Sequence, residues 1–184
     1  SSRLRLIAVP PPGRTVAEAI EEAVCPPWFP VPLTTAGAQI TYETLPADGV
    51  SVGTLEVRGV PLAHPGGVIA YRISEGGRSI VIATDVEAGE PASDAALRQL
   101  ASGAAVLVHD AQYTPEEQVT RRRGWGHSTW EAAAQAAVDA GVGRLLLTSH
   151  DPERPDDAVD ALVESARRLF PQTEGAFEGQ LVEV

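Results

Sequence analysis

The sequence predicts one domain of the α/β (α+β) class over residues 1–184. Two observations support this class. Strand-like segments dominate the first half of the chain, whereas the second half alternates helical segments with short buried strands. With 184 residues and 43% hydrophobic side chains, the chain can also bury a substantial core. We find no internal repeat and no linker that would divide it.

The N-terminal part is predicted to contain a strand, a short helix and a proline-rich loop. Residues 3–9 alternate in polarity, as a strand does. Thr15 and Glu18 form a capping-box pattern, which opens a helix that ends near Val24. Residues 25–33, CPPWFPVPL, contain four prolines, so this stretch is an ordered loop or an edge segment and not a helix.

The middle of the chain is predicted to be mostly β-structure. Strand-like runs occupy residues 39–45, 54–60, 68–74 and 79–84. The Gly76–Gly77 pair separates the last two runs and predicts a hairpin, because paired glycines suit a two-residue turn.

The second half is predicted to alternate between helices and strands. Its elements are a helix at 94–102, a strand at 104–109, a helix opening near Ser128, a strand at 143–150, a helix at 156–169 and a last strand at 179–184. Ser128 with Glu131 forms a second capping-box pattern, and Gly141 is a typical helix end.

Charge and cysteine content exclude several classes of protein. A formal net charge of −11 disfavours non-specific binding to nucleic acid and to anionic membranes. No apolar run approaches the roughly 20 residues of a membrane span, and no signal peptide is visible. The single cysteine, Cys25, excludes an internal disulfide and a cysteine-based zinc cage. We therefore expect a cytoplasmic protein without a membrane partner.

Potential ligands follow the predicted strands. Three apolar runs end in such residues, at Asp85, at His109 with Asp110, and at His150. The remaining two histidines, His64 and His127, lie in loops. Catalytic and metal-binding groups often lie just past strand ends, so this placement favours a metal site or an acid–base site. From the residues alone, Asp85 could instead cap a turn, and His64 could be an ordinary loop histidine.

The same segments resemble a known family. The matching stretches are TD at 84–85, HDAQYT at 109–114 and GWGHSTWEAAAQAAVDAGVGRLLLTSHDP at 124–152. Together they resemble the C-terminal part of metallo-β-lactamase-fold hydrolases, in the ribonuclease Z-like phosphodiesterase branch. The resemblance covers residues 60–152 and extends more weakly back through the proline-rich segment. It implies an αββα sandwich with a two-metal site on its edge.

The resemblance assigns roles to individual residues. It implies that His64 binds the first metal, that Asp85 bridges both metals and that His150 binds the second. A carboxylate has two oxygens and can span two cations, which would explain why a buried strand leads to an acid. His127 matches the histidine that contacts the scissile phosphate.

Two further residues match the His-Glu-Ala-Thr segment of the family. Asp110 stands in place of its glutamate and is the expected catalytic partner of His127. His109 is expected to be a hydrogen-bonding neighbour of the ligands and not a ligand itself. In the arginine run 121–123, Arg122 and Arg123 are candidates for phosphate binding, although such runs are usually solvated surface.

One family motif is absent from the sequence. The signature His-x-His-x-Asp-His should precede the matched region, but no histidine precedes His64. The resemblance therefore implies a C-terminal portion of the fold, whose N-terminal β-layer is incomplete or missing. We expect metal binding by this chain alone to be weak or absent.

The predicted function is a metal-dependent hydrolase of small phosphodiesters, acting through a two-metal site that activates a hydroxide. Two divalent metals are implied, with zinc the first choice and manganese or iron the alternatives. The expected partner is a small-molecule substrate, a phosphodiester or a nucleotide, and not a large nucleic acid. A homo-oligomer or a companion chain could complete the site. The alternative is a non-catalytic remnant or interaction module of the same fold that has lost its metal site.

Overall fold

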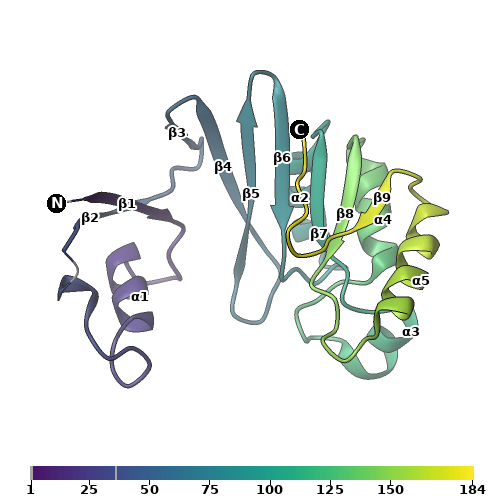
Figure 1. Cartoon of the computed structure of the whole chain (residues 1–184), viewed down its shortest axis with the longest axis horizontal. Coiled ribbons are helices and arrows are strands. Elements are labelled where there is room, and N and C mark those ends of the chain that lie inside the picture. Colours follow the sequence, from purple (N-terminus) through teal and green to yellow (C-terminus); the bar gives the residue numbers. More distant parts are fainter. Residues whose placement is uncertain (1, 36) are drawn as a thin grey trace. The chain divides into compact units, whose positions relative to one another are not determined.

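The computed structural model describes residues 2–35 and 37–184 (Figure 1). The chain forms two compact units, Ser1–Val50 and Ser51–Val184. The single domain expected over residues 1–184 stays a prediction. Among the described helices, none has both the length and the apolar character needed to cross a membrane.

The first unit pairs two distant segments of the chain. Its elements are β1 (Arg3–Ala8), α1 (Val16–Ala23), the 3₁₀ turn η1 (Leu33–Thr35) and β2 (Gln39–Thr44). The strands run parallel, with Arg3 opposite Gln39. The capping box is confirmed, because the Thr15 side chain accepts a hydrogen bond from the Glu18 amide while the Glu18 carboxylate accepts one from the Thr15 amide.

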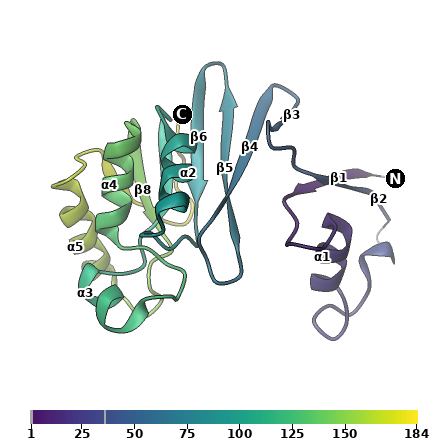
Figure 2. The ribbon, with the colours of Figure 1, turned by 180° about the vertical axis from the view of Figure 1, so that it is seen from behind.

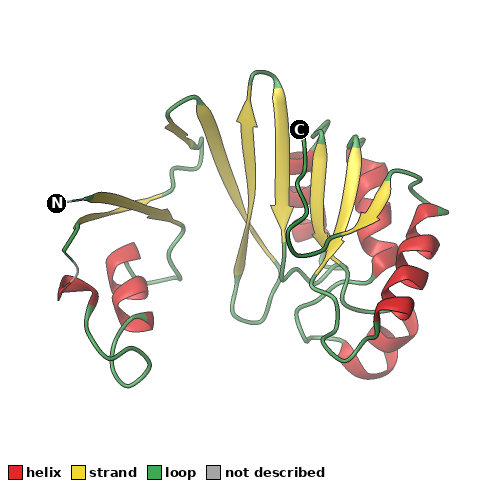
Figure 3. Ribbon diagram, in the orientation of Figure 1, coloured by secondary structure: helices red, strands yellow, loops and turns green. Residues whose placement is uncertain are grey.

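A seven-stranded sheet forms the body of the second unit (Figure 3). In spatial order its strands are β3 (Val50–Val52), β4 (Leu55–Leu62), β5 (Val68–Glu75), β6 (Arg78–Ala83), β7 (Val106–Asp110), β8 (Arg144–Thr148) and β9 (Thr173–Gly175). Strands β4 to β6 are antiparallel neighbours, and β6 to β9 are parallel. The predicted hairpin is confirmed, since Gly76 and Gly77 both have positive φ between paired residues Glu75 and Arg78.

Helices cover one face of this sheet (Figures 1 and 2). The helical elements are α2 (Pro91–Ala101), α3 (Pro115–Glu117) with the π-helical turn η2 (Gln118–Arg122), α4 (Trp130–Ala140) and α5 (Asp156–Arg167). Helices α2 and α4 pack on each other and on the sheet, while α5 packs on α4 and β9. Fully buried Leu107, Leu145 and Leu147 belong to the core between the helices and strands.

Two local predictions are wrong. No strand forms at residues 179–184, where Leu181 is almost fully exposed. The last strand is β9, which pairs with β8 and packs under α5. Helix α4 is capped by Thr129 and not by Ser128, because the Thr129 side chain accepts from the Ala132 amide. Ser128 is buried and has a different role, described below.

Candidate metal and acid–base site

The sheet topology places the candidate residues at one edge. Strand β4 is antiparallel to β5, and β5 is antiparallel to β6, so β4 runs in the direction of β6, β7 and β8. All four strands therefore end at the same edge of the sheet. His64, Asp85 and His150 each follow the last residue of such a strand by two positions, and Asp110 is the last residue of β7.

Asp110 is the buried centre of this edge, with 0% of its surface exposed. One carboxylate oxygen accepts from His127 Nδ1 at 2.6 Å and from the Asp85 amide at 3.1 Å. The other accepts from the amides of Ser128 at 3.0 Å and Gln112 at 3.3 Å. Four donors occupy the roughly four lone-pair sites of a carboxylate. Both oxygens of Asp110 therefore accept hydrogen bonds from neighbouring residues, and neither is left free to bind a metal ion.

His127 is held in one orientation by this carboxylate. Because Nδ1 faces Asp110, it carries the proton in the neutral ring and leaves Nε2 as the reactive nitrogen. The ring packs edge-on against Tyr113, with centroids 6.0 Å apart, and against His64, with centroids 5.8 Å apart. Its side chain is 19% exposed, so a ligand can reach it. The expected pairing of His127 with Asp110 is present in the structure.

His64 presents its second ring nitrogen in the same way. Its Nδ1 lies 2.9 Å from the carbonyl oxygen of Gly126. A carbonyl only accepts, so in the neutral ring Nδ1 carries the proton and donates it, and Nε2 keeps its lone pair. This is the tautomer that a histidine ligand needs when it binds a metal through Nε2.

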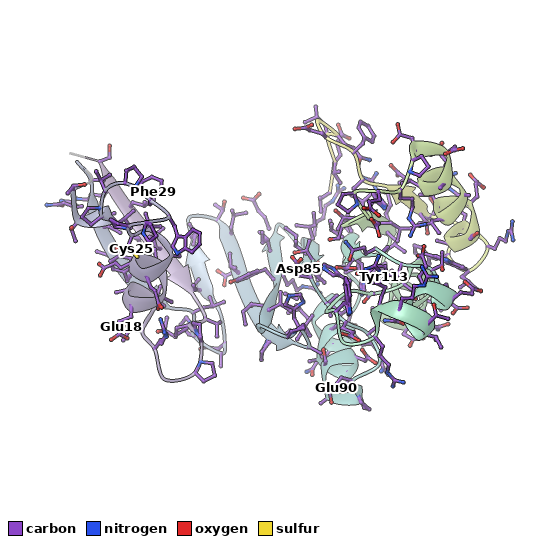
Figure 4. The ribbon with its side chains drawn as sticks, turned by 90° about the horizontal axis from the view of Figure 1, so that it is seen from below. Glu18, Cys25, Phe29, Asp85, Glu90 and Tyr113 are labelled. Atoms are coloured by element: carbon purple, nitrogen blue, oxygen red, sulfur yellow. The ribbon has the colours of Figure 1, made fainter. Side chains whose placement is uncertain are left out.

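Asp85 sits in a loop just past β6, in an unusual backbone conformation. Its φ is +55°, a left-handed value that costs a non-glycine residue roughly 1–3 kcal/mol. The hydrogen bond from its amide to Asp110 holds it there. Its exposed side chain, labelled in Figure 4, has no hydrogen-bond donor to its carboxylate among the described residues. One carboxylate oxygen lies within 4.8 Å of ligand atoms of Asp110 and His127. Asp85 is therefore free to bind a cation.

His150 has two ring nitrogens that are shielded from solvent. Neither finds a hydrogen-bond partner within residues 2–35 and 37–184. Leaving buried polar groups unpaired costs about 1–3 kcal/mol each, and an ion or an ordered water is the usual explanation. Burial also lowers the pKa of His150, which keeps the ring neutral and able to bind a metal. The donor set of this edge therefore fits a divalent metal.

His150 is tied to the other residues through the backbone. Thr148, two positions earlier, pairs with Asp110 across β7 and β8, and its carbonyl accepts from the Ala111 amide at 2.9 Å. The intervening Ser149 has φ +58° and turns the chain out of the strand. That the side chains of His64, Asp85 and His150 meet at one point stays a prediction.

His109 points away from this edge. Successive residues of a strand face opposite sides of the sheet, so His109 lies on the helix side while Asp110 lies at the site. It is fully buried beside α2 and α4, and its Nδ1 contacts the Asp110 carbonyl at 2.7 Å. Burial lowers the pKa of His109, so the ring stays neutral.

The two candidate arginines lie four and five positions before His127 in the chain. The Arg122 guanidinium lies over the Trp125 ring at 4.4 Å and over the Tyr113 ring at 5.7 Å. Arg123 is exposed and lines a hollow of about 350 Å³ together with His64. Neither guanidinium forms an ion pair with a carboxylate of the described residues.

Sequence reasoning missed three residues that organise the site. Ser128 donates to the Val86 carbonyl at 2.6 Å and accepts from the Ala88 amide, which joins the loop after β6 to the start of α4. Tyr113 supports the His127 ring, and Glu87 binds the loop before it. The capping-box pattern was the only sequence signal at Ser128, and no local pattern marks Tyr113 or Glu87.

Comparison with known families gives a clear match. The family described as "Beta-lactamase superfamily domain" matches residues 14–150, which is most of the chain. Ribonuclease Z of Brevibacillus brevis is 37% identical over 102 residues, covering 53% of this chain and 30% of its own. Ribonuclease BN of Escherichia coli K12 is 30% identical over 165 residues, covering 89% of this chain and 46% of its own. The matched regions thus span 30% and 46% of the length of these relatives.

Solved structures confirm the fold. The metallo-β-lactamase fold protein YhfI from Bacillus subtilis superposes with a TM-score of 0.65 at 20% identity, covering 81% of this chain and 58% of its own. Zinc-bound PqqB from Methylobacterium extorquens gives 0.63 at 16% identity, covering 98% and 62%. The α/β class and the family resemblance expected from the sequence are both confirmed.

Proposed function

Since the chain belongs to the beta-lactamase superfamily, we propose that it supplies the catalytic edge of a metal-dependent phosphodiester hydrolase. The observation that carries this proposal is a division of roles among the candidate residues. The Asp110 carboxylate accepts hydrogen bonds from His127 and Ser128. In contrast, the Asp85 carboxylate and the His150 ring nitrogens have no hydrogen-bond partner within the described residues, so they can bind a metal. The site therefore combines an oriented acid–base histidine with a set of potential metal ligands.

Two divalent metals would fit the free ligands. His64 and Asp85 would hold one, and Asp85 and His150 would hold the other, with zinc the first choice and manganese or iron the alternatives. Such metals, when bound, polarise a phosphoryl group and turn water into a nucleophile near neutral pH. The zinc-bound relative named above supports a metal in this fold.

His127 would act on the substrate itself. With Nδ1 bound to Asp110, its Nε2 would face the phosphate and either stabilise the developing charge or protonate the leaving oxygen. Asp110 would preserve the tautomer and orientation of the ring throughout. The neighbouring Tyr113 ring restricts the rotation of His127.

The substrate we propose is a small phosphodiester or a nucleotide. The relatives named ribonuclease support a nucleotide phosphodiester. Arg122, fixed on the Trp125 ring, would offer its in-plane N–H groups to a phosphate, and Arg123 would add charge nearby. The net charge of −11 favours a small substrate over a large nucleic acid. A second copy or a companion chain could contribute to the site.

The direct test is an assay of the whole protein with zinc or manganese. We expect it to hydrolyse bis(p-nitrophenyl) phosphate or a 2′,3′-cyclic nucleotide, to lose this activity to a chelator and to regain it when metal returns. Activity against p-nitrophenyl acetate but not against either diester would contradict the choice of substrate. Diester hydrolysis that persists after complete metal removal would contradict the proposal that the reaction depends on a metal.

A second candidate function is a non-catalytic remnant or interaction module. The 184 residues supply two of the assigned ligands for each metal. A whole protein that binds no zinc and hydrolyses no diester would favour this candidate over the hydrolase.

We expect the 184 residues by themselves to bind zinc weakly. A catalytic zinc site has about three protein ligands besides water, and here each metal would have two. Competition with a chromogenic chelator measures the affinity. Stoichiometric, tight binding of two zinc ions by this chain would show that the ligand set assigned here is incomplete.

A further inference from the structure

We propose that Glu87 is a positioning residue of this site, which sets the ring tautomer of His64 by clamping the loop at Gly124–Gly126. The value of this clamp for catalysis rests on the proposed function. The clamp itself is a property of the fold and can be tested without any activity.

Glu87 connects three segments that are distant in sequence. Its two carboxylate oxygens accept from the amides of Gly124 at 2.6 Å and Gly126 at 2.8 Å. Its own amide donates to the Ala63 carbonyl at 2.9 Å, next to His64. Hydrogen bonds to an ionised carboxylate are roughly twice as strong as neutral ones, so the loop before His127 is held firmly.

The Gly126 residue transmits this constraint to His64. Its N–H points to Glu87, and its carbonyl oxygen accepts from His64 Nδ1 at 2.9 Å. As long as Glu87 fixes this segment, the carbonyl stays beside the ring and Nδ1 keeps its proton. Nε2 is then left as the acceptor, which is the atom a metal would bind. Outer partners of this kind typically change metal affinity by about 10–100-fold when removed.

The loop that contains Gly126 and the loop that contains His64 pack so closely that their contact depends on a glycine. Gly126 has φ +87°, and a Cβ on it would lie 2.3 Å from His64 Nδ1 and 2.6 Å from Pro65 Cδ. Only glycine therefore allows the chain to approach His64 this closely. This close packing keeps the Gly126 carbonyl beside the His64 ring, where it selects the tautomer.

The clamp is separable from the stability of the rest of the site. Ser128, directly after His127, is anchored independently by bonds to the Val86 carbonyl, the Ala88 amide and the Asp110 carboxylate. Loss of the Glu87 carboxylate should therefore loosen residues 124–126 while leaving the start of α4 in place.

The test compares Glu87→Gln with Glu116→Gln. A glutamine has one acceptor oxygen, so it can serve only one of the two glycine amides and turns its own NH₂ toward the other. Glu116 is exposed, lies on α3 and makes no side-chain hydrogen bond within the described part of the chain. Both variants remove one negative charge, so Glu116→Gln controls for the change in charge.

The primary measurement is ¹⁵N NMR of the histidine rings in the metal-free chain. We expect His64 to be the Nδ1–H tautomer in the wild type, a mixture of tautomers in Glu87→Gln and unchanged in Glu116→Gln. In the whole protein, zinc affinity measured by chelator competition with zinc alone should fall about tenfold in Glu87→Gln only. A lower melting temperature without a change of tautomer would reduce Glu87 to a purely structural role and overturn the proposal.

The wild type alone can also refute the clamp. If Glu87→Gln does not fold, an Nε2–H tautomer of His64 in the metal-free wild type would still overturn the proposal. This outcome does not depend on the proposed hydrolysis. If the protein cleaves no phosphodiester but Glu87→Gln changes the tautomer of His64, the clamp is supported and the proposed function is wrong.

Discussion

Replacing Asp85 by asparagine is expected to remove both metals and to abolish phosphodiester hydrolysis in the whole protein. Asparagine has one acceptor oxygen and cannot bridge two cations as a carboxylate does. A metal contributes several kcal/mol to such a reaction, so we expect the rate to fall on the order of a thousandfold. The backbone should tolerate this change, because asparagine adopts a left-handed φ such as +55° as readily as aspartate.

The measurements for Asp85→Asn are metal content by elemental analysis and turnover of a diester substrate. Asp48→Asn is the matched control, since Asp48 is exposed and forms no side-chain hydrogen bond within the described residues. We expect that control to behave as the wild type. A folded Asp85→Asn protein that retains both metals and full activity would exclude Asp85 as the bridging ligand.

Replacing His127 by alanine is expected to separate catalysis from metal binding. A positioned general acid or base typically contributes about 10²–10⁴-fold, so turnover should fall by that factor. Metal content should stay nearly unchanged, because Nδ1 of His127 is committed to Asp110 and no metal is assigned to this ring.

The comparison with His64→Ala makes this separation testable. His64→Ala removes a proposed ligand, so it should lower metal affinity together with the rate. Equal loss of metal in both variants would make His127 a ligand. An unchanged rate in a folded, metal-loaded His127→Ala protein would remove it from the catalytic machinery.

Much of the fold could be predicted because its signals are local. The Gly76–Gly77 turn needs two residues with positive φ, and the Thr15–Glu18 box needs only one helical turn. The predicted strand at 179–184 failed because an alternating pattern does not show whether a neighbouring strand is available for pairing. The short strand Thr173–Gly175 forms where α5 and β8 provide that neighbour.

The candidate site was predictable where it follows strand ends. Asp85 and His150 stand out because a buried apolar run leads directly to a polar residue. Glu87 could not be found in this way, since its partners Gly124 and Gly126 are more than 35 positions away and meet it only in the folded chain. Ser128 was mistaken for a cap because the residue beside it, Thr129, has the same capping chemistry.

The central claim is that Asp85, together with His64 and His150, holds two metals while Asp110 and His127 do not. Anomalous scattering at the zinc absorption edge, from crystals of the whole protein grown with zinc, tests it most directly. We predict two peaks about 3.5–4 Å apart. The Asp85 carboxylate should lie between them, with His64 on one metal and His150 on the other. A single peak bound by Asp85, Asp110 and His127, whose ligand atoms lie within 4.8 Å of one another, would contradict the account.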